Sequence, residues 1–95
     1  MADRDLHIVS YDISSNRRRT RFAKALGNFG SRVQYSVFEC LIGAKQVETI
    51  CQIANRLIDR ETDSVRIYRL CPRCAETVAI IGWGEVTAEE DVRIV

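Results

Sequence analysis

Residues 11–21 hold the side chains best suited to chemistry on a phosphate group. Asp12 follows directly after a run of β-forming residues, and arginines stand at positions 17, 18, 19 and 21. A carboxylate at a strand end, where the chain opens into a loop, is well placed to hold Mg²⁺, which prefers oxygen ligands and keeps several waters. The alternative is that Asp12 only caps this loop or the helix that follows it.

The basic residues after Asp12 gather at a predicted helix start. The N-terminus of a helix carries a partial positive charge, so adjacent arginines there are unfavourable unless an anion binds, and phosphate is the obvious anion. The competing interpretation is a solvated face whose charges pair with acids elsewhere. The net charge of +1 gives no evidence for or against nucleic-acid binding, because acidic residues near the C-terminus offset the charge of the basic cluster. The predicted nucleic-acid-binding residues are Arg17, Arg18, Arg19, Arg21 and Lys24.

One carboxylate in each chain is little for cutting a phosphodiester bond, because metal nucleases commonly use two metals or several acidic ligands. A two-fold dimer that brings two copies of Asp12 together would supply the second carboxylate. The single histidine, His7, lies within a predicted strand, so we expect a structural role for it and not that of a general base.

The four cysteines divide into two kinds. Cys40 falls in a predicted strand and Cys51 on the apolar face of a predicted helix, so both are expected to be small buried residues with reduced thiols. Cys71 and Cys74 have the C-x-x-C spacing of a redox pair or of half a zinc site. Because this pair stands between two predicted strands and has no second pair of matching spacing, a turn with two buried thiols is the favoured interpretation.

The elements that must position these residues follow from hydrophobic periodicity and turn residues. The order is that of a βαββαβ ferredoxin-like fold, of the α+β class, with an extra C-terminal strand. Residues 1–95 are expected to form one domain, with residues 84–95 as a tail. The predicted elements are a strand over 6–11, a helix from Arg17 to Gly30, a stretch over 32–42 split into two strands by a bend near 34–36, a helix over 44–59, and strands over 64–70, 78–83 and 92–95.

Several predicted strands are apolar on both faces. In the first strand Leu6 and Ile8 point one way, and Val9 and Tyr11 point the other way. The helices of a ferredoxin-like fold cover only one face of the sheet, so the other face needs a partner. A homodimer with two sheets face to face is the favoured solution, and the alternative is that the C-terminal tail covers this face within one chain.

The composition is that of an ordinary globular protein. Hydrophobic residues make up 46% of the 95 residues and charged residues 28%. No apolar run reaches the roughly 18 residues that span a membrane, and the first apolar run is too short for the core of a signal peptide. We therefore expect a cytoplasmic protein without a membrane segment.

Three motifs together resemble one known family. Tyr11-Asp12-Ile13 ends the first strand and is followed by a helix entered through arginines. Residues 32–39 read RVQYSVFE, and residues 65–71 read VRIYRLC, followed by Cys74 and an apolar stretch that ends at Gly82. The pattern is similar to that of the CRISPR-associated endonuclease family, the second and smaller of the two core adaptation protein families, over most of the chain.

This resemblance implies a ferredoxin-like homodimer with Mg²⁺ bound by Asp12 at the interface, opposite its symmetry mate. It implies metal-dependent cutting of single-stranded RNA or double-stranded DNA. It also implies a place as the central dimer of the complex that inserts new spacers into a CRISPR array for antiviral defence, where a larger integrase performs strand transfer. The positions that the family's motifs link to activity are Tyr11, Asp12, Arg19, Arg21, Arg32 and Phe38.

Three classes of function stay open at this point. The first is a metal-dependent nuclease and the second is a non-catalytic DNA scaffold for the CRISPR integrase. The third is a small ligand sensor, which would not need arginines at a helix start. Residues 92–95 alternate like a strand after an acidic spacer, and we expect them to add a strand to a partner's sheet edge.

Overall fold

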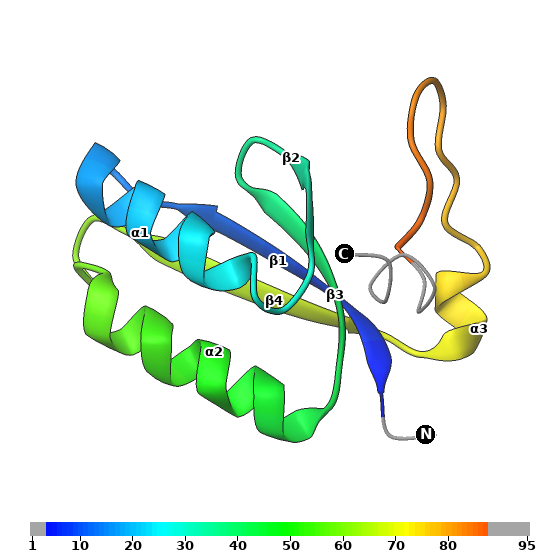
Figure 1. The fold of residues 1–95 in the computed structure, drawn as a ribbon, viewed down its shortest axis with the longest axis horizontal. Helices are drawn as coiled ribbons and strands as arrows, with labels where there is room; N and C mark the ends of the chain where they lie inside the picture. Colours follow the sequence, from blue (N-terminus) through cyan, green and yellow to red (C-terminus); the bar gives the residue numbers. More distant parts are fainter. Residues whose placement is uncertain (1–3, 88–95) are drawn as a thin grey trace.

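The computed structural model describes residues 4–87 and has the ferredoxin-like architecture that the sequence predicts (Figure 1). The four strands form one antiparallel sheet in the order β2-β3-β1-β4, and α1 and α2 lie together on one face of it. The elements are β1 (Asp5–Asp12), α1 (Asn16–Leu26), β2 (Ser31–Gln34), β3 (Val37–Ile42), α2 (Ala44–Leu57), β4 (Ser64–Leu70) and the short α3 (Pro72–Ala75).

Helix α1 begins as predicted but ends one turn earlier. Ser15 is the N-cap, and its side chain accepts a hydrogen bond from the Arg18 amide at 3.2 Å. The helix ends at Leu26, and Gly30, which was expected to end it, lies beyond a further turn. Gly30 has another role, because a Cβ there would overlap the Glu39 carbonyl oxygen and lie 2.7 Å from the Cα of Cys40. The residue must be glycine so that the chain can pass close to β3.

The predicted bend within residues 32–42 is confirmed. Tyr35 and Ser36 form the turn between β2 and β3, and an irregularity in the pairing lies between Arg32 and Gln34. The bend needs no glycine or proline, which is why the sequence marks its position only weakly.

Helix α2 covers the sheet beside α1 and ends at Leu57, two residues before the predicted end. Ile50 and Ala54 are buried, but Cys51 is exposed, so the prediction of a buried Cys51 was wrong. Successive residues of a helix are turned by about 100°, which places Cys51 at the side of the apolar face centred on its neighbour Ile50.

The core lies between the helices and one face of the sheet. The alternate residues of β1 and β3 on this face include Val9, Tyr11, Phe38 and Cys40, all of them buried. They pack against Phe22, Leu26, Ile50 and Ala54 from the two helices. Burial raises the pKa of the Cys40 thiol to about 11, with a further contribution from the charge of Glu39, so this cysteine is an inert core residue, as expected.

The opposite face of the sheet, here called the open face, is covered by neither α1 nor α2. By the strand register its residues include Ile8, Glu39 and Tyr68 side by side, with Tyr68 half exposed. The segment after α3 returns to the rim of this face, where the Thr87 amide donates a hydrogen bond to Glu39 Oε1 at 2.9 Å. The chain as far as Thr87 therefore leaves part of this face uncovered.

Residues 78–83 do not form the predicted strand. The chain leaves the sheet at α3 and continues as a long loop (Figure 1), in which Ile81 and Trp83 are almost fully exposed. A strand forms only where a neighbour offers backbone hydrogen bonds, and this segment has no such neighbour among the described residues. Gly82 and Gly84 adopt positive φ angles of 101° and 126°. The predicted strand over residues 92–95 lies outside the described residues.

No helix in residues 4–87 is long and apolar enough to cross a membrane.

Candidate active site

Asp12 lies where the sequence placed it, at the end of the central strand β1 and four residues before α1. Its side chain is exposed, and its strand partner is Ser64 in β4. Because strand residues alternate between faces, Asp12 belongs to the open face while Tyr11 points into the core. Asp12 is therefore available to a metal ion, a nucleic acid or a second chain.

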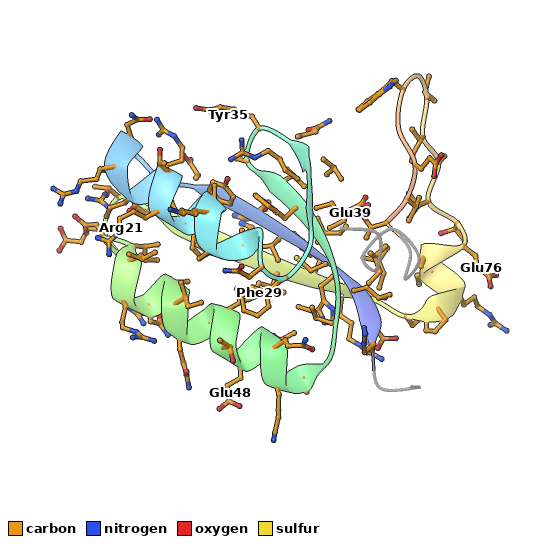
Figure 2. All side chains as sticks on the ribbon, in the orientation of Figure 1. Arg21, Phe29, Tyr35, Glu39, Glu48 and Glu76 are labelled. Atoms are coloured by element: carbon orange, nitrogen blue, oxygen red, sulfur yellow. The ribbon has the colours of Figure 1, made fainter. Side chains whose placement is uncertain are left out.

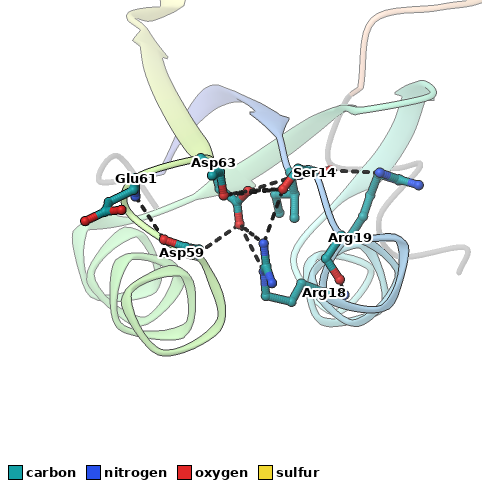
Figure 3. A network of polar contacts seen from close by, with 9 residues as sticks. Ser14, Arg18, Arg19, Asp59, Glu61 and Asp63 are labelled. Carbon is teal, nitrogen blue, oxygen red and sulfur yellow. Dashed lines mark hydrogen bonds and ion pairs between the residues drawn. The ribbon is translucent and has the colours of Figure 1, made fainter.

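The loop between Asp12 and α1 is held by a buried carboxylate, that of Asp63 (Figure 3). Its oxygens accept hydrogen bonds from the Ser14 amide at 3.0 Å and from the Asp59 amide at 2.9 Å, while Arg18 forms an ion pair with it at 2.9 Å. The Ser14 and Thr62 hydroxyls add two further bonds. Burial by itself would raise the pKa of Asp63, but these bonds and the Arg18 charge together hold that pKa far below its usual range.

The structure sorts the five predicted nucleic-acid-binding cations into two groups. Arg18 is bound to Asp63, and Arg19 donates to the Ile13 carbonyl oxygen at 2.7 Å and to Asn16 Oδ1 at 2.8 Å, so both position the loop. For Arg18 the competing interpretation, a charge paired within the fold, is the one that holds. The remaining three are exposed on one side of α1 at helical spacing and form no ion pair within residues 4–87. These three, here called the basic stripe, are Arg17, Arg21 and Lys24.

A groove of about 540 Å³ runs between α1 and the β2–β3 hairpin and brings together three of the residues that the family's motifs link to activity, Arg19, Arg32 and Phe38. The Arg32 guanidinium lies 5.5 Å from the centre of the Phe38 ring and 5.9 Å from that of Tyr35, at the hairpin tip (Figure 2). Lys24 also lines the groove, whose nine lining residues include no acid. Asp12 is not among them, so carboxylate and groove are separate features of the surface.

Two predicted site residues belong to the core and expose almost no surface. Tyr11 and Phe38 are 5% and 4% exposed. The Tyr11 ring packs edge-on against Phe22 at 5.2 Å, and its hydroxyl donates to the Tyr35 carbonyl oxygen at 3.4 Å. The structure gives both residues a positioning role, because they fix the base of the β2–β3 hairpin against α1.

The described residues offer few donor groups for the metal ion that the sequence implies. Within residues 4–87 there is no cluster of three or more His, Cys, Asp or Glu side chains that could hold a metal ion. Asp63 is unsuitable, because its oxygens are occupied by protein donors. Asp12 is an exposed carboxylate, the type of oxygen ligand that Mg²⁺ prefers, and water or a second chain would have to complete the coordination. His7 is buried and its Nδ1 bonds to the Asp5 carbonyl oxygen at 2.8 Å, which agrees with the predicted structural role.

The comparison with known proteins decides the family. The family model described as CRISPR associated protein Cas2 matches residues 5–78, which include every described element. The chain belongs to the Cas2 family. This confirms the resemblance carried by the three sequence motifs.

Named relatives of this Cas2 protein are nucleases. The chain is 48% identical over 79 residues to "CRISPR-associated endoribonuclease Cas2 1" of Chloroflexus aurantiacus, covering 82% of this chain and 85% of that protein. It is 36% identical over 89 residues to "CRISPR-associated endonuclease Cas2 2" of Thermus thermophilus, covering 94% of each. One relative is thus named for RNA and the other for nucleic acid in general.

Solved structures share the fold. A hypothetical protein of Thermus thermophilus superposes with a TM-score of 0.78 at 36% identity, over 87% of this chain and 96% of that one. Cas2 of Streptococcus pyogenes, solved at pH 6.5, gives 0.72 at 32% identity, over 81% and 99%. The α+β ferredoxin-like fold predicted from the sequence is therefore confirmed both by the computed structure and by these neighbours.

Asp63 is the residue of this site that the sequence analysis missed. It stands immediately before β4 and 49 residues after Ser14, so only the folded sheet brings the two together. A faint signal was present in the sequence, because a carboxylate just before an apolar strand is a polar group at the edge of the core.

Proposed function

We propose that this Cas2 protein is a metal-dependent endonuclease that cuts phosphodiester bonds in single-stranded RNA or double-stranded DNA as a homodimer. The observation that supports the proposal most is the exposed carboxylate of Asp12 at the end of β1, just before a helix that carries three exposed cations without an ion pair to any other described residue. Its relatives' names, endoribonuclease and endonuclease, point to the same reaction.

Each part of the site has a role in this proposal. The basic stripe neutralises backbone phosphates, a contact that fixes the position of a nucleic acid without selecting its sequence. Arg32, in the groove, adds a further cation, held in place by the Phe38 and Tyr35 rings. Asp63 and its partners Ser14, Arg18 and Asp59 keep the loop after Asp12 in one conformation.

Asp12 is the proposed metal ligand. A Mg²⁺ ion held there would polarise a phosphate oxygen and lower the pKa of a bound water. Within residues 4–87 each chain contributes Asp12 as its proposed ligand, and in the proposed homodimer the open faces meet, so that the second carboxylate is the symmetry-related Asp12. The apolar residues of the open face, which need a cover, support this arrangement.

A second function is favoured by one specific observation. Asp12 is the sole predicted metal ligand in the described chain, whereas the basic surface consists of several exposed residues. A non-catalytic DNA scaffold for a larger CRISPR integrase would use the basic stripe and would not need the metal.

The test is cleavage of labelled single-stranded RNA and double-stranded DNA by the full chain, with Mg²⁺ and with a chelator. Asp12→Ala is compared with Glu48→Ala, which removes an equal charge from the outer side of α2 (Figure 2). The nuclease proposal expects Mg²⁺-dependent cutting that Glu48→Ala retains and Asp12→Ala loses. An absence of cutting by all three proteins, with salt-sensitive DNA binding preserved, would overturn it and establish the scaffold.

A further inference from the structure

The C-x-x-C pair after β4 is not buried, contrary to the sequence-based expectation of a turn with two buried thiols. Cys71 is half-buried and Cys74 is exposed, and both are free thiols. They are two of the four cysteines, and they contrast with Cys40, which is fully buried in the core. Neither thiol contributes to the core or to the proposed nuclease site, so packing does not account for the pair.

The two sulfur atoms belong to a single helical turn. Cys71 is the N-cap of α3, and its sulfur accepts a hydrogen bond from the Cys74 amide at 3.5 Å. The Cys74 thiol interacts with the same sulfur. Pro72, between them, fixes the backbone at the first position of the turn. Residues three apart in such a turn are close enough for a disulfide, which spans about 4.4–6.8 Å between Cα atoms.

The two thiols are chemically unequal. The Cys74 hydrogen bonds, the Arg73 amide and the charge of Arg69 lower the pKa of Cys71, whereas the proximity of Cys71 raises the pKa of Cys74. A thiolate is the nucleophile in thiol–disulfide exchange, and the more acidic partner of a pair attacks first. The geometry brings the two thiols together, and the difference in pKa assigns their roles. Cys71 is the nucleophile and Cys74 is the resolving thiol.

We propose that Cys71 and Cys74 are a redox modification site that forms a reversible intrachain disulfide by exchange with a small disulfide such as glutathione disulfide. The Cys71 thiolate attacks one sulfur of glutathione disulfide, whose S–S bond breaks and releases one glutathione. Cys74 then loses its proton and attacks the Cys71 sulfur, which releases the second glutathione. The two cysteines are oxidised by two electrons in total, and one glutathione disulfide is reduced to two glutathione molecules.

The experiment uses the full chain, reduced and then equilibrated with increasing ratios of glutathione disulfide to glutathione. Free thiols are trapped by alkylation after an acid quench and mapped by peptide mass spectrometry. Cys71 and Cys74 are expected to lose alkylation together, by about tenfold, while the chain loses two hydrogen atoms and gains no glutathione at these positions. Cys51, an exposed cysteine without a neighbouring thiol, is the internal control and keeps its alkylation over the same range.

Two variants separate the mechanism from simple exposure of a thiol. Cys74→Ser removes the resolving thiol, so Cys71 is expected to stop as a mixed disulfide with glutathione. Cys51→Ser is the matched control and should behave like the wild type. Stable glutathione adducts at both Cys71 and Cys74 of the wild type would overturn the proposal. So would a Cys71 that is oxidised no more readily than Cys51.

Discussion

At the scale of single residues, the carboxylate of Asp63 holds the loop that follows Asp12, although the two residues are far apart in the sequence. Its side chain is fully buried and accepts bonds from Ser14, Asp59, Thr62 and Arg18. A buried carboxylate with this many donors is stabilised as the charged form. It thereby ties the start of β4 to the loop that follows Asp12.

The first prediction concerns Asp63→Asn. The amide keeps the size of the side chain but loses the charge, and it leaves Arg18 without its counter-ion. We expect the Tm to fall by more than about 5 °C at neutral pH. Glu48→Gln, on the outer face of α2, is the control and should leave the Tm unchanged. Equal Tm values for wild type and Asp63→Asn would contradict the structural role of the network.

The second prediction is the pH dependence of that stabilisation. The pKa of Asp63 is lower in the folded protein than in the unfolded chain, where it is about 3.9. The ionised form therefore stabilises the fold at pH values above the unfolded pKa, and this contribution is lost as the pH falls toward the folded pKa. The difference in Tm between wild type and Asp63→Asn should be constant near neutral pH and should shrink below about pH 4. A difference that grows on acidification would be the opposite result.

At the scale of elements, the packing of the chain after α1 against β3 depends on Gly30. Replacing it by alanine places a methyl group on the Glu39 carbonyl oxygen and close to Cys40. Overpacking of this kind typically destabilises a protein by about 1–3 kcal/mol, and we expect Gly30→Ala to do so in denaturant unfolding. Gly27→Ala is the matched control, because Gly27 has φ −59° and its nearest neighbour would be 3.3 Å away. Equal loss in both variants would show that chain flexibility, and not close packing, determines the effect.

The basic stripe of α1 gives a prediction about binding. Arg21→Ala should weaken the binding of nucleic acid to a similar extent for all sequences and reduce the slope of log K against log salt by about 1. Arg56→Ala removes an equal charge from the last turn of α2 and is expected to leave the slope unchanged. The measurement is a titration of labelled DNA at several salt concentrations. An equal effect of the two variants would mean that net charge matters and the stripe does not.

The elements were largely predictable from the sequence, since the periodicity of residues 44–57 and the β-forming residues of β1, β3 and β4 are local signals. What the sequence did not predict depends on neighbours distant in the chain. Residues 78–83 read as a strand because they are apolar, but a strand also needs a pairing edge. Gly30 read as a helix end, whereas its role is set by contact with β3. In the site, the position of Asp12 at the end of the first strand was predicted. Which of the arginines are bound within the fold and which are exposed could not be predicted, because Arg18 pairs with Asp63, which is distant in the sequence.

At the scale of the whole molecule, the open face of the sheet is the surface through which we propose that the protein dimerises. Its exposed apolar surface includes Tyr68, which is 50% exposed, beside partly buried residues of β1 and β3. A homodimer through this face would bring the two Asp12 side chains onto one interface, as the proposed function requires.

This assembly gives a prediction for sedimentation equilibrium. The wild type should be a dimer, and Tyr68→Asp should raise the dissociation constant by at least about tenfold, since a charge in an apolar interface opposes association by more than about 1.4 kcal/mol. Tyr35→Asp changes an even more exposed tyrosine, at the hairpin tip, and serves as the control. A wild type that sediments as a monomer would leave the open face to the C-terminal tail and remove the paired carboxylates.

In the proposed function, the Asp12 carboxylate acts in phosphodiester cleavage and not in binding. The most direct measurement is the Mg²⁺-dependent cleavage rate and the equilibrium nucleic-acid affinity of wild type and Asp12→Asn, determined on the same labelled substrate. We expect the rate to fall by about a hundredfold or more while the affinity changes by less than about twofold, because only the charge of the proposed metal ligand is lost. An unchanged rate in Asp12→Asn, or an equal loss of rate and affinity, would contradict it.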